Sequence, residues 1–258
     1  RWQVGSILNI GNLGSAIMII SDGGVVSSQQ GYISSALGIV EVTGIGSHWD
    51  NADHLSVGYA ANSDSTLNIL NGGVVSSGFS YVGNQPGSKG QVNISGSGSS
   101  WQNSSLIVAG FSGDGRITVS DGASLSSTGG YIGLLPSAKG EILITGTGSS
   151  WVNSGDLGIG QAGGNGSLTI SNNGIVQTGN VAVAVDASSV STLNIGSAAG
   201  ELATAAGYLD APLITLGSGD GHVVFNHTNN NYQFNPIIAG TGSVDVYSGT
   251  TILNGINT

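Results

Sequence analysis

The stretch from Leu106 to Ser154 contains one segment twice, as Gly-Arg-Ile-Thr-Val-Ser at 115–120 and again as Gly-Glu-Ile-Leu-Ile-Thr at 140–145. Internal repeats with a period of roughly 20 to 50 residues are typical of solenoids and other repeat architectures. The repeated segment is rich in β-branched residues and is punctuated by glycine. Each unit is therefore predicted to be a coil of short strands rather than a pair of helices.

The same unit recurs along the chain, and the last apolar residue before each turn marks it. These residues recur at a nearly constant interval, at Ile20, Val42, Ile69, Ile94, Val119, Ile144, Ile170, Ile195, Val224 and Val246. Around them apolar and polar residues alternate, as in Leu67-Asn68-Ile69, and this alternation predicts a half-buried strand. Most are followed by Asp-Gly, Asn-Gly or Gly-X-Gly, where glycine permits the positive φ of a tight corner.

Each unit contains two further short strands, of the type Val74–Ser77 and of the type Leu55–Gly58. Three strands and three corners in each unit predict a triangular coil, and coils stacked about 4.8 Å apart pair their strands in parallel. The predicted fold is all-β: a right-handed, three-faced parallel β-helix of about ten coils of about 25 residues. Residues 1–196 are predicted to be regular and residues 197–258 a more degenerate continuation of the same solenoid domain, with a short helix-like excursion or a broad loop at 200–206.

Aromatic residues divide the coils into two alternating kinds. Trp49, Trp101 and Trp151 each lie seven residues beyond the residue that marks their unit. Tyr32, Tyr81 and Tyr131 alternate with leucines in a similar way, so the full repeat spans two coils. We expect both kinds of ring to pack a corner of the coil. The alternative, a tryptophan ladder that stacks on sugars, is disfavoured by the internal register of these residues.

Composition excludes several classes of protein. The chain of 258 residues has 46 Gly, 39% hydrophobic and only 7% charged residues, and its apolar positions are too regular for a disordered segment. Its net charge is −10 with four Lys and Arg, so binding of nucleic acid, which needs a basic surface, is disfavoured. Without cysteine it forms no disulfide or thiolate metal site. No apolar run approaches the roughly 20 residues of a membrane helix, so no membrane insertion by this fragment is expected. The chain starts and stops inside repeats, and we expect it to be a piece of a longer protein.

Two longer motifs resemble a known family. The signature Gly-x-Gly-Ser-x-Trp-x-Asn-Ser…Gly-x-Leu-Thr-Ile-Ser-x-x-Gly lies within Gly146 to Gly174, and a Val-Val-Phe-Asn-His-Thr segment opens the run from Val223 to Val244. They resemble the passenger-domain repeats of AIDA-type bacterial autotransporter adhesins. This resemblance implies a signal peptide upstream, an outer-membrane β-barrel downstream and display at the bacterial cell surface. It also implies attachment to host surface components (a glycan or extracellular-matrix protein), cell–cell aggregation through another copy, biofilm formation and virulence. No cofactor or metal is implied.

One candidate site is a column of charges. Asp64, Lys89, Asp114 and Lys139 recur at one constant interval, so they are predicted to stack on one edge with alternating sign. The column is interpreted first as a solvated edge that fixes the register. A second hypothesis is that the basic residues Lys89, Arg116 and Lys139 bind an anionic glycan.

A second candidate site is an outward column of mostly polar, nearly uncharged side chains. Its predicted members are Glu41, Asn68, Asn93, Thr118, Leu143, Thr169 and Asn194. Such side chains can hydrogen-bond a glycan or a second copy without desolvating many charges. A long repetitive face also suits multivalent contact, in which many weak bonds sum.

Two other functions are weighed against adhesion. A polysaccharide-degrading β-helix enzyme would need clustered carboxylates, and the densest group is His48, Asp50, Asp53 and His54. The segment Gly217–His222 contains Ser, Asp and His, but consecutive residues in a glycine-rich loop do not form a preorganised triad. Calcium at Asp114 is disfavoured because lysines occupy the equivalent positions in the neighbouring coils. We therefore expect no enzymatic activity; an inert stalk that presents a distal adhesive tip is the other alternative.

Overall fold

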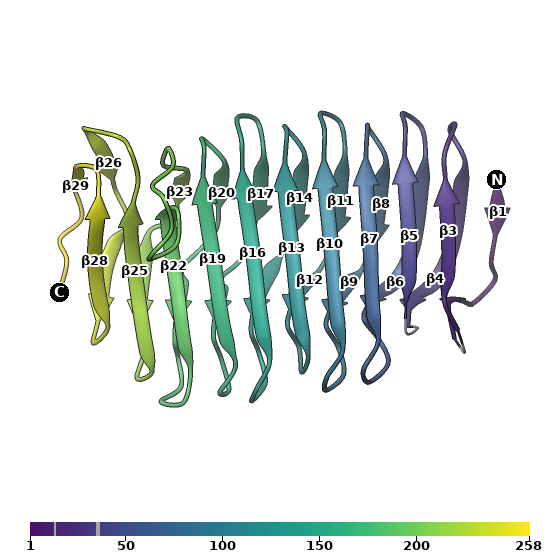
Figure 1. The fold of residues 1–258 in the computed structure, drawn as a ribbon, viewed down its shortest axis with the longest axis horizontal. Helices are drawn as coiled ribbons and strands as arrows, with labels where there is room; N and C mark the ends of the chain where they lie inside the picture. Colours follow the sequence, from purple (N-terminus) through teal and green to yellow (C-terminus); the bar gives the residue numbers. More distant parts are fainter. Residues whose placement is uncertain (13, 35–36) are drawn as a thin grey trace.

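The computed structural model describes residues 1–12, 14–34 and 37–258. Within these ranges every regular element is a strand, and the strands form a parallel β-solenoid of about ten turns with about 25 residues per turn. Strands of the front sheet point up in Figure 1, the strands that follow them run down behind, and the chain advances from right to left. This sense of winding is right-handed, so the predicted fold is confirmed.

Face 1 is a continuous sheet with one strand from each coil. In the described part of the chain its ten strands are β3 (Ala16–Ile20), β5 (Gly38–Thr43), β7 (Asp64–Leu70), β10 (Lys89–Ser95), β13 (Asp114–Ser120), β16 (Lys139–Thr145), β19 (Asn165–Ser171), β22 (Val190–Gly196), β25 (Asp220–Asn226) and β28 (Ser243–Ser248). Every neighbouring pair is parallel, and Figure 1 shows this sheet from its outer side.

Faces 2 and 3 share two long strands, β4 (Val25–Ile33) and β6 (His48–Val57), whose first halves belong to face 2 and second halves to face 3. The other strands of face 2 are β1 (Trp2–Gln3), β8 (Val74–Ser77), β11 (Ser100–Asn103), β14 (Ser124–Ser127), β17 (Ser150–Asn153), β20 (Ile175–Gln177) and β23 (Tyr208–Asp210). Those of face 3 are β2 (Ile7–Ile10), β9 (Phe79–Val82), β12 (Leu106–Ala109), β15 (Gly129–Ile132), β18 (Leu157–Ile159), β21 (Val181–Val183), β24 (Leu213–Leu216) and β27 (Ile237–Gly240). Near the C-terminus, β26 (Tyr232–Phe234) pairs with β29 (Thr251–Leu253).

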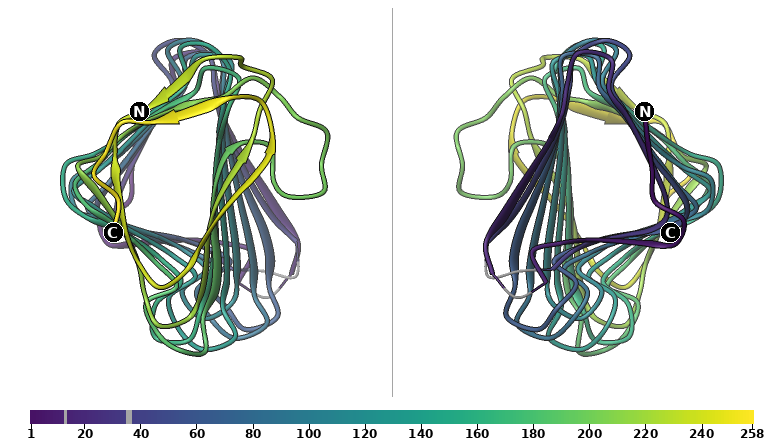
Figure 2. Two further views of the ribbon diagram at one scale, coloured as in Figure 1. Left: turned by 90° about the vertical axis from the view of Figure 1, so that its left-hand side faces the viewer. Right: turned by 90° about the vertical axis from the view of Figure 1, so that its right-hand side faces the viewer.

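The core is a set of side-chain columns inside the coil, whose backbone Figure 2 shows end-on. On face 1 the register pairs Ile69 with Ile94 and Ile94 with Val119, and all three are fully buried. The alternation read from the sequence therefore places apolar side chains inward and polar ones outward. A single coil cannot bury its inner face alone, so each coil is stabilised by its neighbours.

The corners after face 1 follow the predicted turn chemistry. Asn71 and Asp121 have φ of 53° and 54°, in the left-handed region, and a glycine with positive φ follows each. Asn and Asp tolerate this region better than other non-glycine residues. The sequence pairs Asn-Gly and Asp-Gly thus turn the chain from face 1 to face 2.

The alternating aromatic residues take different places. Trp49, Trp101 and Trp151 are fully buried at the start of face 2, so their predicted packing is confirmed and the alternative of a sugar-stacking tryptophan ladder is wrong. The prediction that the tyrosines also pack a corner is wrong. Tyr81 lies half-buried on the outer side of face 3, because the alternation within β9 turns Ser80 and Val82 inward.

The C-terminal coils differ from the regular ones in one insertion. Residues 197–207 form a loop that projects beside face 1 (Figure 2), so a broad loop rather than a helix-like excursion lies here. The prediction that Val224 marks the inward position of β25 is wrong by one residue: Ile195 pairs with Phe225, and Val224 follows Asn194 in the outward column. Val224 is only 2% exposed although it lies in the outward column. An apolar residue at this position therefore does not identify the inner side of the strand.

Candidate functional site

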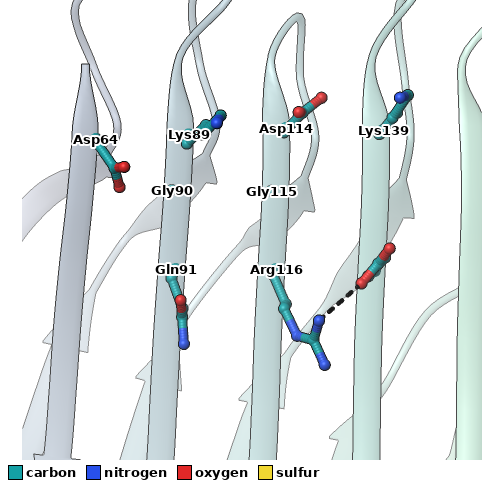
Figure 3. Close-up of a pocket in the computed structure, with 9 residues that line it drawn as sticks. Asp64, Lys89, Gly90, Gln91, Asp114, Gly115, Arg116 and Lys139 are labelled. Carbon is teal, nitrogen blue, oxygen red and sulfur yellow. Dashed lines mark ion pairs between the residues drawn. The ribbon is translucent and has the colours of Figure 1, made fainter. Parts of the chain in front are cut away.

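The outer surface of face 1 begins with the predicted column of charges, drawn in Figure 3. Lys89 pairs in register with Asp64 on one side and Asp114 on the other, and Lys139 pairs with Asp114. All four are exposed first residues of their strands. Opposite charges therefore face each other on neighbouring coils, which favours this register over a shifted one. Exposed pairs of this kind contribute roughly 0 to 1 kcal/mol each.

A second row of polar and charged side chains lies beside the first. Arg116 Nη1 is 3.3 Å from Glu141 Oε2, and these side chains are 56% and 58% exposed. Together the two rows line a hollow of about 310 Å³. The structure thus brings together the basic residues Lys89, Arg116 and Lys139, but with the carboxylates of Asp64, Asp114 and Glu141 between them. Formal charges in the hollow sum to zero, which leaves little attraction for a polyanion. Binding of an anionic glycan stays a prediction.

The predicted polar ladder is continuous along face 1. The register places its members side by side on successive strands, in the order Glu41, Asn68, Asn93, Thr118, Leu143, Thr169 and Asn194. Neighbours bond to one another: Asn93 Nδ2 donates to Asn68 Oδ1 at 2.8 Å, and Asn194 Nδ2 donates to Thr169 Oγ1 at 3.1 Å. Asn194 is only 1% exposed and its Nδ2 donates to three oxygens, whereas Asn68 and Asn93 are half-buried. A primary amide has two N–H donors and two acceptor lone pairs, so Asn68 and Asn93 keep capacity for a partner.

The loop at 197–207 forms one wall of a groove beside this ladder. Asn226 is buried and its Nδ2 donates to the carbonyls of Ala198 and Glu201, both at 2.9 Å, which holds the loop in place. The groove has a volume of about 660 Å³ and is lined by loop residues and by the ladder residues Leu143 and Thr169. The sequence pattern did not predict this groove. One feature of the sequence could have indicated an inserted loop. Ile195 and Phe225, which pair on neighbouring strands, are separated by more residues than the preceding pair, Ile170 and Ile195.

A histidine bridges two coils at the C-terminal end of face 1. His222 Nε2 is 2.9 Å from Asp220 Oδ1, and His222 Nδ1 is 2.8 Å from Asp245 Oδ2. The hydrogen bond to Asp245 is the main cause that raises the pKa of His222; partial burial opposes it and the charge of Asp220 adds to it. Hydrogen bonds from His222 and then Ser243 lower the pKa of Asp245. The side chain of His222 therefore links β25 to β28.

This histidine does not have the geometry of a serine-hydrolase triad. Ser243 Oγ is 2.6 Å from His222 Nδ1 and 2.8 Å from Asp245 Oδ2, so serine and carboxylate share one ring nitrogen. In a Ser-His-Asp triad the serine bonds Nε2 and the carboxylate bonds Nδ1. Here Nε2 bonds the carboxylate of Asp220 instead. A ring whose two nitrogens both contact carboxylates is poorly placed to act as a base for a serine hydroxyl.

The densest ionisable group in the sequence is divided among separate contacts. Asp53 Oδ2 accepts a hydrogen bond from Gln30 Nε2 at 2.9 Å and lies 3.4 Å from His54 Nδ1. Asp50 Oδ1 accepts instead from Ser76 Oγ at 2.9 Å. Among residues 1–12, 14–34 and 37–258 no group of three or more His, Asp and Glu could hold a metal ion. In the same ranges no helix is long and apolar enough to cross a membrane.

A segment of the chain is similar to part of a bacterial protein. Over 104 residues, 37% of this chain, it is 43% identical to the "Uncharacterized lipoprotein YdeK" of Escherichia coli (strain K12). The matched segment is 8% of that relative's length, so the chain spans a small part of it. No family model matches the chain, and no solved structure matches it.

Proposed function

We propose that the chain is a segment of a bacterial cell-envelope adhesin that binds a second copy of itself through the polar ladder of face 1. The observation that supports this proposal is the register of the ladder, which aligns hydrogen-bonding side chains on successive coils with one apolar interruption at Leu143. The lipoprotein name of the relative supports a location in the cell envelope. Display outside the cell, attachment to host surface components and biofilm formation rest on the resemblance to AIDA-type passengers and belong to the same proposal.

The chemistry of the ladder suits contact between copies. Its amides and hydroxyls bond a like surface, and apart from Glu41 no charge must be desolvated when two ladders meet. Each single contact is worth only about 1 kcal/mol after exchange with water. A row that repeats once per coil makes many such contacts at once, so that weak bonds add up along the rod.

Two alternatives predict different behaviour. An inert stalk presenting a distal tip would have the same regular coils but would show no self-association. A polysaccharide-degrading enzyme would need paired carboxylates in a groove, and Asp50 and Asp53 take part in separate contacts. The absence of enzymatic activity stays a prediction.

The test compares two variants that each add three positive charges, on different faces of the solenoid. The first adds three lysines to the ladder on every second coil, at Asn68→Lys, Thr118→Lys and Thr169→Lys. The control adds three lysines to the outer surface of face 2, at Ser76→Lys, Ser126→Lys and Gln177→Lys. Both variants change the net charge of −10 by the same amount, so general charge effects cancel between them.

Self-association is measured by sedimentation equilibrium of the purified chain and by clumping of cells that display it. We expect the wild type and the face 2 variant to associate, and the face 1 variant to stay monomeric because like charges meet at the contact. Equal association of both variants would place the contact elsewhere. A monomeric wild type that leaves displaying cells dispersed would favour the inert stalk.

A further inference from the structure

The outer surface of face 3 has a strip of aromatic rings in the N-terminal half of the chain. We call this group the aromatic strip; its members are Tyr59, Tyr32, His54, Phe79, Tyr81 and Phe111. Each ring contacts the next in this order, with centroids 4.3 to 5.7 Å apart. The spacing is the normal contact range for aromatic pairs. His54 and Phe79 are stacked at an interplanar angle of 16°, whereas Phe79 and Tyr81 meet edge to face at 74°, so the rings form one contiguous strip with differently oriented faces.

The two-coil repeat produces this strip. In the register of face 3, Tyr32 and Tyr81 are separated by Ser56 on the coil between them, and Tyr81 and Tyr131 are separated by Val108. Ser56 and Val108 point outward but are buried. The same arrangement recurs in the next pair of coils, where a Cβ on Gly158 would lie only 2.9 Å from Tyr131 Cδ1. The tyrosine rings therefore lie across the small residues of neighbouring coils, with their other side half exposed.

A polar edge flanks the rings and is held by its own hydrogen bonds. Tyr32 Oη donates to Gln30 Oε1 at 3.0 Å, and Gln30 Nε2 donates to Asp53 Oδ2 at 2.9 Å. The bond from Gln30 is the main cause that lowers the pKa of Asp53, so this carboxylate is charged at neutral pH. Further along, Phe79 and Tyr81 border a hollow of about 210 Å³ together with Leu106.

We propose that the aromatic strip binds a neutral, extended polysaccharide, whose hexopyranose rings stack on Phe79 and Tyr81 and whose hydroxyls bond the polar edge at Gln30 and Asp53. This deepens the adhesive role proposed above, but it uses a different face and does not depend on self-association. It also differs from the anionic-glycan hypothesis for face 1 in both position and ligand charge.

The chemistry of a sugar ring matches this surface. The C–H groups on one side of a pyranose carry a partial positive charge and pack on the negative face of an aromatic ring. Three of the four Lys and Arg side chains of the protein lie on face 1, whereas the carboxylate of Asp53 lies on the polar edge beside the strip. An anionic glycan would therefore be repelled here.

The experiment titrates the purified chain with hexasaccharides by isothermal calorimetry and by NMR. The neutral probes are the β-1,4-linked and α-1,4-linked glucose hexamers and the β-1,4-linked N-acetylglucosamine hexamer. The anionic probe is the galacturonic acid hexamer. The test variant is Phe79→Ala with Tyr81→Ala. The matched control is Tyr208→Ala with Tyr247→Ala, which removes two exposed rings outside the strip.

We expect at least one neutral hexamer to bind and the test variant to weaken it by about tenfold to a hundredfold, the sum of two stacking contacts. The control should bind as the wild type does, and so should Tyr81→Phe. The single variant Tyr81→Ser adds a test that keeps the fold, because serine occupies the same column on the neighbouring coil at Ser56.

Four results would overturn the proposal: no neutral hexamer bound by the wild type, stronger binding of the galacturonic acid hexamer, equal binding by the wild type and Tyr81→Ser, or equal loss in the control. Sedimentation of the same variants separates the two functions. The strip variants are expected to self-associate as the wild type does. If they lose self-association and leave sugar binding unchanged, the strip is a contact between copies instead.

Discussion

Asn153 occupies the polar corner inside the coil, and its replacement by alanine gives a quantitative test of how the coils are joined. Its side chain is 1% exposed and lies next to the buried Trp151. Its Oδ1 accepts a hydrogen bond from Ser127 Oγ at 2.9 Å on the preceding coil. Its Nδ2 donates to three oxygens at 2.8 to 3.2 Å, those of Gly155, Asp156 and Thr178.

The loss of unfolding free energy expected for Asn153→Ala depends on which hydrogen bonds the former partners of Asn153 retain. Ser127 Oγ still accepts from Trp151 Nε1 at 3.0 Å, and the carbonyl of Gly155 still accepts from Thr178 Oγ1 at 3.1 Å. No partner is therefore left wholly unsatisfied, and the loss is that of the bonds themselves, at about 1 kcal/mol each. We expect the free energy of unfolding to fall by about 2 to 4 kcal/mol.

The measurement is urea unfolding followed by tryptophan fluorescence and by circular dichroism, since agreement of two probes is needed before a repeat protein is treated as two-state. Asn93→Ala is the control, because this asparagine bonds Asn68 and Gln91 on the solvent side of face 1. Asn93→Ala should lower the free energy of unfolding by less than about 1 kcal/mol. A loss below about 1 kcal/mol for Asn153→Ala, or equal losses for both, would refute the account of the buried corner.

Three further predictions concern the core, the charged column and the C-terminal coils. Trp101→Ala should cost about 3 to 5 kcal/mol in unfolding free energy, because it empties a fully buried site; a loss under about 1 kcal/mol would contradict the packing. Lys89→Asp puts three acids on neighbouring coils and should lower the melting temperature at low salt, with little change at high salt; an effect independent of salt would exclude a charge interaction. The raised pKa of His222 predicts a contribution to stability that is full below the unfolded pKa of about 6.5 and is lost as pH rises through the folded pKa. Melting temperatures of wild type and His222→Gln should therefore converge as the pH rises above about 6.5, and a constant difference would contradict this.

The coil and its register could be predicted from the sequence because a parallel stack converts a constant interval into vertical alignment. The interval that separates Lys89 from Asp114 became a direct pairing, as did the equal interval between Asn68 and Asn93. Each position in a coil meets the same position above and below it. A constant interval in the sequence therefore specifies which residues are neighbours on adjacent coils.

Features that depend on one insertion or on the direction of a ring could not be predicted in this way. The loop at 197–207 is held against face 1 by Asn226, and Val224 is buried although its register places it in the outward column. Tyr81 has an apolar ring but occupies an outward position, because small residues in the same column leave room for the ring on neighbouring coils. Both effects depend on contacts between coils that the pattern within one coil does not specify.

The most direct test of self-association through face 1 uses the absence of cysteine in the chain. A single spin label is attached at Thr118→Cys on the polar ladder, or at Ser126→Cys on the outer surface of face 2, and dipolar coupling between copies is measured at equal concentration. The proposal predicts coupling between copies at Thr118→Cys and none at Ser126→Cys. Coupling at Ser126→Cys with none at Thr118→Cys would show that the copies meet through another face.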